Sequence, residues 1–258
     1  AGIISCAGVF SVFFGFMYGS FFGFEDVLKA IWLKPMNQMM DVPLVGRLNA
    51  VFMIAIGFGM FIILICMVFN IINSIRRGDT EKTWFDSNAV AGLVFYGSIV
   101  LTIGLFISGK KLPAAAILVI MFGVPLLLMF LKEPLTNLVE KKSKILPEQK
   151  GMFFVKSFFE LFEVLLSYLS NTLSFLRIGA FAVSHAAMME VVLMLAGATN
   201  GGNPNWIVVV LGNIFVCAME GLIVGIQVLR LEYYEIFSRF YAGNGREFKP
   251  FMKAAHKN

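Results

Sequence analysis

The sequence predicts an all-α fold, that of a polytopic transmembrane helical domain, and three observations support this class. Of the 258 residues, 59% are hydrophobic and only 14% are charged, whereas about a quarter of the residues in soluble domains are charged. The mean hydropathy is high, +0.82. The apolar residues also gather in runs of about 20 residues or more, the length that an α-helix needs to cross a bilayer.

Six runs are long enough to be transmembrane helices, namely 1–24, 50–74, 89–108, 113–131, 155–196 and 205–240. In the first, Gly15, Gly19 and Gly23 recur at intervals of four, which favours close packing of another helix. In the second, Arg76 and Arg77 follow the apolar run and are expected to end it at the membrane surface. The sequence therefore predicts about six spans.

The last two runs are too long for upright spans. Helices of about 42 and about 36 residues measure about 63 Å and about 54 Å, against a hydrocarbon core of about 30 Å. The connection between them, 196–205, is uncharged and rich in Gly and Asn, as in a tight loop. We expect a long helical hairpin that is tilted or extends into the cytoplasm.

Lysine and arginine are distributed unequally between the two sides. The second and fourth connections and the C-terminal tail hold fourteen, and the other three connections hold five. The larger group comprises Arg76, Arg77, Lys82, Lys132, Lys141, Lys142, Lys144, Lys150, Lys156, Arg239, Arg246, Lys249, Lys253 and Lys257. The smaller group comprises Lys29, Lys34, Arg47, Lys110 and Lys111. The positive-inside rule then places both ends of the chain in the cytoplasm.

Other features narrow the class further. A net charge of +5 does not indicate a nucleic-acid partner here, because the basic residues follow the loops of a membrane protein. Cys6, Cys66 and Cys217 each lie in an apolar run, so neither a disulfide nor a metal site is expected. The chain starts at Ala1 without a basic segment before the first run, and we expect a fragment of a longer protein.

A polar face runs along the fifth apolar run. At 100° per residue, six polar residues fall within about 80° of Arg177 on one helix face. They are Glu163, Ser167, Ser170, Ser174, Ser184 and His185. Glu190 falls near −140° and so faces elsewhere.

A second polar stripe follows the last run. Asn213, Glu220 and Gln227 repeat every seven residues, and Arg230 lies one turn beyond Gln227. Charges inside spans are costly and usually mark an ion route, so two such helices can enclose a hydrated path. The competing interpretation is that Glu163–Arg177 and Glu220–Arg230 are ion pairs that only hold helices together.

Enzyme chemistry has little support in the sequence. Ser184 and His185 are adjacent and therefore about 100° apart on a helix, which excludes a nucleophile–base pair. No HExxH, GxSxG, P-loop or GxGxxG motif occurs. We expect no catalytic, metal or cofactor-binding residues. A secondary transporter or channel, or a structural scaffold, remains the alternative, although the inverted repeat of many transporters is lacking.

Two segments resemble a known family. They are FEVLLSYLSNTLSFLRIGAFAVSHAAM (162–188) and CAMEGLIVGIQVLRLEYYEIFSRFYAGNGREFKPF (217–251). They resemble the membrane domain of the large stator subunit of V/A-type rotary ATPases, called subunit a in eukaryotes and subunit I in archaea and bacteria. Arg177 matches the family's essential arginine in an S-x-L-R context, His185 follows eight residues later, and Glu163 matches an acidic position. The pattern of the last span matches at Glu220, Gly221, Leu229–Leu231, Glu235, Arg239–Tyr241, Gly243, Gly245, Pro250 and Phe251.

The resemblance implies a function. Arg177 would be the fixed cation past which a rotor ring of carboxylate-bearing subunits carries protons or sodium ions. Glu163, Ser170, Ser174 and His185 would border one aqueous half-channel, while Asn213, Glu220, Gln227 and Arg230 would serve the other or its gate. Peripheral-stalk and central-stalk subunits would be further partners, and nucleotide hydrolysis would occur elsewhere.

The resemblance also implies an organisation. Residues 1–154 would form a four-span helical support region with cytoplasmic connectors, and 155–258 the ion-translocation hairpin with a cytoplasmic tail. Polar residues of the eukaryotic form are missing around Arg230, which favours the prokaryotic branch and a prokaryotic cell membrane. A cytoplasmic N-terminal arm and two further helices would precede Ala1.

Overall fold

The computed structural model describes most of the chain. The described residues are 2–19, 23–24, 31, 39–42, 46–78, 83–111, 113–139, 150–198, 204–241 and 243. Several residues named above lie outside them: the basic residues of 141–149, Lys29, Lys34, Lys82, Gly245, Pro250 and Phe251, and the tail cations Arg246, Lys249, Lys253 and Lys257.

The described part is mainly helical, as predicted. Its helices are α1 (Gly2–Tyr18), α2 (Ala50–Arg77), α4 (Val90–Ile107), α5 (Ala115–Phe130), α6 (Lys132–Val139), α7 (Lys150–Ser174), α8 (Leu176–Leu195) and α9 (Trp206–Leu231). A π-helical turn, η2 (Glu232–Phe237), and the short α10 (Ser238–Phe240) extend α9. The sequence did not predict the antiparallel hairpin of β1 (Met39–Val42) and β2 (Gly46–Asn49) that precedes α2.

Four helical segments of the described part are long and apolar enough to cross a membrane. They are Ala50–Arg77, Val90–Ile107, Gly151–Leu195 and Trp206–Phe240. A fifth results if α5 and α6, which meet at 72°, are taken as one broken span. Helix α1 is apolar but has only 17 residues. The expected count of about six spans is therefore not confirmed: the described residues contain four candidate spans, or five with the bent pair.

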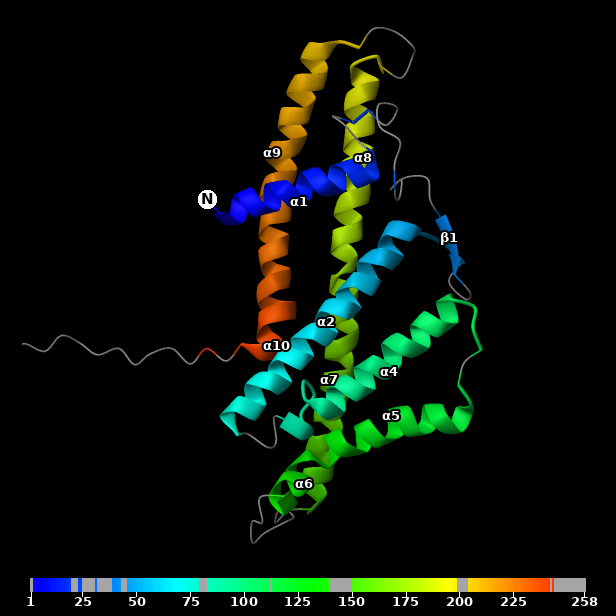
Figure 1. The fold of residues 1–258 in the computed structure, drawn as a ribbon, viewed down its shortest axis with the longest axis vertical. Coiled ribbons are helices and arrows are strands. Elements are labelled where there is room, and N and C mark those ends of the chain that lie inside the picture. Colours follow the sequence, from blue (N-terminus) through cyan, green and yellow to red (C-terminus); the bar gives the residue numbers. More distant parts are fainter. Residues whose placement is uncertain are drawn as a thin grey trace, which may run out of the picture.

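The long segments pack side by side (Figure 1). Helices α7 and α8 continue one another over 45 residues, and α9 lies along α8. Helix α2 crosses α8, while α4 and α5 pack together beside α7. Asn49 caps α2 by accepting a hydrogen bond from the Val51 N–H, and Gly78, with φ of 72°, ends it directly after Arg77. Arg76 and Arg77 thus end this helix as predicted.

The main core lies where α2, α4, α5 and α7 meet the α7–α8 junction. Its fully buried side chains include Tyr96, Ile63, Met67 and Phe175. Phe175 is 0% exposed and packs on Gly59 of α2, where a larger residue has no room. A smaller cluster of Met189, Val192 and Val216 joins α8 to α9. The junction between α7 and α8 is therefore held from several sides.

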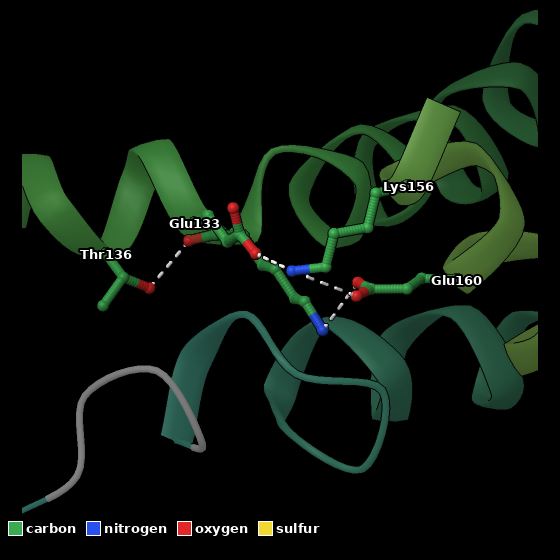
Figure 2. Close-up of polar contacts among 5 residues, drawn as sticks. Glu133, Thr136, Lys156 and Glu160 are labelled. Carbon is green, nitrogen blue, oxygen red and sulfur yellow. Dashed lines mark hydrogen bonds and ion pairs between the residues drawn. The ribbon is translucent and has the colours of Figure 1, made fainter. Parts of the chain in front are cut away.

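An ion-pair network ties α6 to α7 (Figure 2). The Lys156 ammonium lies 2.6 Å from Glu133 and 3.6 Å from Glu160, and Lys132 lies 3.0 Å from Glu160. Lys132 lies at the start of α6 and Lys156 lies in α7, and each is paired with a carboxylate of the other helix. Exposed pairs of this kind contribute at most about 1 kcal/mol each, so they orient the α6–α7 corner more than they stabilise it.

Candidate functional site

Arg177 lies at a break in the helix. Helix α7 ends at Ser174 and α8 begins at Leu176, with a tight turn at Phe175, whose N–H donates to the Thr172 carbonyl at 3.3 Å. The ring of Phe175 fills the core between them. Because the junction is packed in this way, the backbone directly before Arg177 is fixed.

The guanidinium of Arg177 is half-buried and joins two long helices. Its Nη2 donates to Ser174 Oγ at 3.2 Å, and its Nη1 donates to the backbone carbonyl of Gln227 on α9 at 3.3 Å. Both acceptors are neutral. Among the described residues no carboxylate forms an ion pair with Arg177, so its positive charge is not neutralised by any residue of that part of the chain.

Ser174 also contacts a residue of the final turn. Its hydroxyl donates to Glu235 Oε1 in η2. Glu235 is only 6% exposed, and its second oxygen, Oε2, is a buried atom without a hydrogen bond within the described ranges. A chain of polar contacts therefore runs from Gln227 through Arg177 and Ser174 to Glu235.

One helical turn beyond Glu235, Arg239 is buried in the interior. Its Nε donates to the Glu235 carbonyl at 3.2 Å, and its Nη1 donates to Asn88 Oδ1 at 2.9 Å. It also lies 5.8 Å from the centre of the Tyr168 ring, a cation–π distance. The sequence count assigned Arg239 to the cytoplasmic tail, which is wrong because the side chain is 6% exposed and packs between helices.

The connector between α2 and α4 is fastened to this region. Asn88 accepts a hydrogen bond at its carbonyl from Asn70 Nδ2 at 2.9 Å, and the Tyr168 hydroxyl donates to the Ser87 carbonyl. These contacts border a cavity of about 100 Å³. Its polar lining comes from Ser87, Asn88, Ser167, Asn171, Ser238 and Arg239. Water is the natural occupant of such a polar space.

The two predicted polar stripes meet at a second point. His185 Nδ1 on α8 lies 2.5 Å from Glu220 Oε2 on α9, with the side chains 47% and 18% exposed. Asn213, also on α9, is buried but donates to its own helix, to the Val209 carbonyl at 2.8 Å. The structure thus brings His185 and Glu220 together and leaves Asn213 apart from them.

Other predicted residues do not join these contacts. Glu163, Ser170 and Arg230 are exposed, and Ser184 is exposed near the far end of the same face. Neither of the ion pairs considered from the sequence forms: Glu220 pairs with His185, and in the described part of the chain Arg177 has no carboxylate partner. The interpretation that these two ion pairs hold the helices together is therefore wrong.

Comparison with known proteins finds similarity to one family. Residues 136–253 match the model of the V-type ATPase 116kDa subunit family. The chain is 26% identical over 265 residues to A-type ATP synthase subunit I of Pyrococcus horikoshii, an alignment that covers 97% of this chain and 36% of the relative. The chain is therefore similar to this family over 136–253 and to subunit I of an A-type ATP synthase over most of its length.

Two shorter matches fall within the same group. A-type ATP synthase subunit I of Saccharolobus solfataricus is 44% identical over 100 residues, which is 35% of this chain and 14% of the relative. The human V-type proton ATPase 116 kDa subunit a 3 is 35% identical over 106 residues, 36% of this chain and 13% of the relative. The chain spans about a third or less of the length of these relatives.

The family segment, 136–253, contains every candidate residue of the two stripes. It also contains Glu235 and Arg239, which sequence reasoning placed in the family pattern but not in the site. One signal could have found them: an acidic residue is followed four residues later by a basic one at the end of an apolar helix. Nothing in the stretch EYYEIFSRF indicated a π-helical turn.

Proposed function

We propose that the chain is part of the membrane stator subunit of a V/A-type rotary ATPase and carries protons or sodium ions past a rotor ring. The observation that carries the proposal is the state of Arg177: half-buried, fixed by two neutral acceptors, and without a carboxylate partner among the described residues. An unneutralised cation in a membrane segment is costly. A carboxylate brought to it by another subunit would offset that cost.

The proposed mechanism follows from the chemistry of the guanidinium group. Arginine stays protonated at any relevant pH. When a ring carboxylate arrives opposite Arg177, the positive charge favours its ionised form, and the bound proton or sodium ion leaves. The same charge blocks cations from passing directly between the two half-channels.

The contacts favour half-channels that each take residues from both helices, one half-channel on either side of Arg177 along the helix axes. His185 lies eight residues, about 12 Å, beyond Arg177, and Glu163 lies fourteen residues, about 21 Å, before it. His185 contacts Glu220 of the neighbouring helix. We therefore assign His185 and Glu220, with Asn213 beyond them, to one half-channel, the outer path, on the side of the 196–205 connection. Glu163 and Ser170 are assigned to the other half-channel, the inner path, on the cytoplasmic side.

The proposed function also implies partners for the chain and an orientation in the membrane. Residues 1–154 would support the helices of 155–258, with both ends of the chain in the cytoplasm of a prokaryote. The rotor ring, the stalk subunits and the bilayer would be its partners, and the nucleotide sites would belong to other subunits. Gln227, whose carbonyl accepts from Arg177, and Arg230, one turn further along α9, would form the gate beside the ring.

Replacing Glu220 by glutamine should slow ATP-driven ion transport by about tenfold, because the outer path loses its ionisable partner of His185, a barrier increase of about 1.4 kcal/mol. The measurement is ATP-driven ion uptake by vesicles that contain the whole complex. Glu190→Gln is the matched control, since Glu190 is exposed on another face of α8. Equal uptake by both variants would count against the outer path.

A further inference from the structure

Glu235 is an unusual residue for its position. It is 6% exposed in a segment long and apolar enough to span the membrane, where a carboxyl group is expensive to bury. One oxygen accepts from Ser174, and the other has no partner in the described part of the chain. Its burial therefore costs stability, and a role in the neighbouring site would account for that cost.

Glu235 lies within the π-helical turn η2 at the end of α9. In η2, hydrogen bonds of the i→i+5 type hold an extra residue in the turn and change the direction of the side chains that follow. Such turns occur frequently at functional sites. Arg239 fixes the turn from the other side, since Nε binds the Glu235 carbonyl and Nη1 binds Asn88 in the α2–α4 connector.

The hydroxyl of Ser174 connects Glu235 to Arg177. A serine hydroxyl has one proton to donate and two lone pairs that accept. Because the proton goes to Glu235 Oε1, the lone pairs are left for Arg177 Nη2, which lies 3.2 Å away. Without Glu235, the hydroxyl would be free to donate to a backbone carbonyl of its own helix instead.

We infer that Glu235 is a positioning residue that orients the Ser174 hydroxyl and thereby holds the Arg177 guanidinium against the Gln227 carbonyl. The inference rests on the proposed function for its effect on transport, but not for its effect on the position of Arg177. The intervening hydroxyl also keeps the carboxyl group from pairing directly with Arg177. The guanidinium is thus held in place while its charge remains available.

The cavity beside Arg239 does not suggest an anion site instead. In the part of the chain that the structure describes, Arg239 leaves Nη2 unpaired, but the carboxyl group of Glu235 lies one turn away on the same segment and would repel an anion. The neighbouring charges are balanced, which suits water.

The test uses four variants of the whole complex. Glu235→Leu removes the acceptor, Ser174→Ala removes the bridge, Glu235→Gln keeps an oxygen that accepts, and Glu232→Gln is a control on the same turn. We expect Glu235→Leu and Ser174→Ala each to slow ATP-driven transport by about tenfold, and the double variant to be no slower than either alone. Glu235→Gln should retain most of the transport, and Glu232→Gln all of it.

Two outcomes would overturn the inference. If Glu235→Gln is as damaging as Glu235→Leu, the carboxylate itself takes part in ion transfer and does not act through Ser174. If the losses of the two single variants multiply in the double variant, the residues act separately. Electron cryo-microscopy of the Glu235→Gln and Ser174→Ala complexes provides a readout independent of transport: Arg177 should keep its contact with Gln227 in the first and lose it in the second.

Discussion

Replacing Arg177 by lysine should abolish ATP-driven ion transport and leave the assembled complex intact. The guanidinium reaches Ser174 Oγ and the Gln227 carbonyl with two different nitrogens, whereas lysine has a single nitrogen and loses its proton readily when buried. We expect transport to fall by more than about a hundredfold, equivalent to about 2.7 kcal/mol of barrier.

The measurement is ion uptake by vesicles, with copurification of the rotor ring as the check on assembly. Arg76→Lys is the control for the chemical change alone, because Arg76 is exposed at the end of α2. Transport by the Arg177→Lys complex at rates near those of the unsubstituted complex would contradict the proposed role. Loss of the ring from the Arg177→Lys complex, with uptake lost as well, would make Arg177 a structural residue.

Replacing Gly59 by alanine should strongly destabilise the fold. A methyl group at Gly59 would overlap the side chain of Phe175, which is completely buried at the α7–α8 junction. Overpacking of this kind costs about 1–3 kcal/mol. Because Phe175 lies between Ser174 and Leu176, the displacement would also move the backbone beside Arg177.

The measurement for Gly59→Ala is the midpoint temperature of thermal unfolding in detergent. It is obtained from the fraction of protein that stays monodisperse as the temperature rises. Gly57→Ala is its control on the same helix, since a methyl group there meets no atom within 4 Å. Alanine also favours a helix over glycine by about 1 kcal/mol, so Gly57→Ala should leave the midpoint unchanged or raise it. Equal midpoints for the two variants would show that α2 does not pack tightly against the junction.

The helices of the fold were predictable because long apolar runs leave few other choices in a membrane. The run 50–74 corresponds to α2, 89–108 to α4 and 205–240 to α9 with its extension. The corner at Leu131 was not predictable from hydropathy, since KEPLTNLV has few apolar residues and yet forms α6 at 72° to α5. At this corner, the ion pairs of Lys132 and Lys156 with carboxylates orient α6 against α7.

The candidate site was predictable only where the helices are regular. Spacing along one face placed Ser174 beside Arg177, but the sequence put His185 and Glu220 in different half-channels, and the structure brings them into contact. Glu235 was missed because its contact with Ser174 depends on how the end of α9 packs against α7, which the spacing along one regular helix does not give. Arg239 was missed because a count of charges by loop cannot separate a solvated arginine from one that packs on Tyr168.

The central claim is that Arg177 faces a carboxylate of a rotor ring. Its most direct test is an electron cryo-microscopy structure of the assembled complex in a lipid membrane. We expect the guanidinium of Arg177 to lie on the surface that contacts the ring, within about 4–6 Å of a ring carboxylate in at least one rotary state. A ring that packs against α4 and α5, with Arg177 facing only its own chain or lipid, would contradict it.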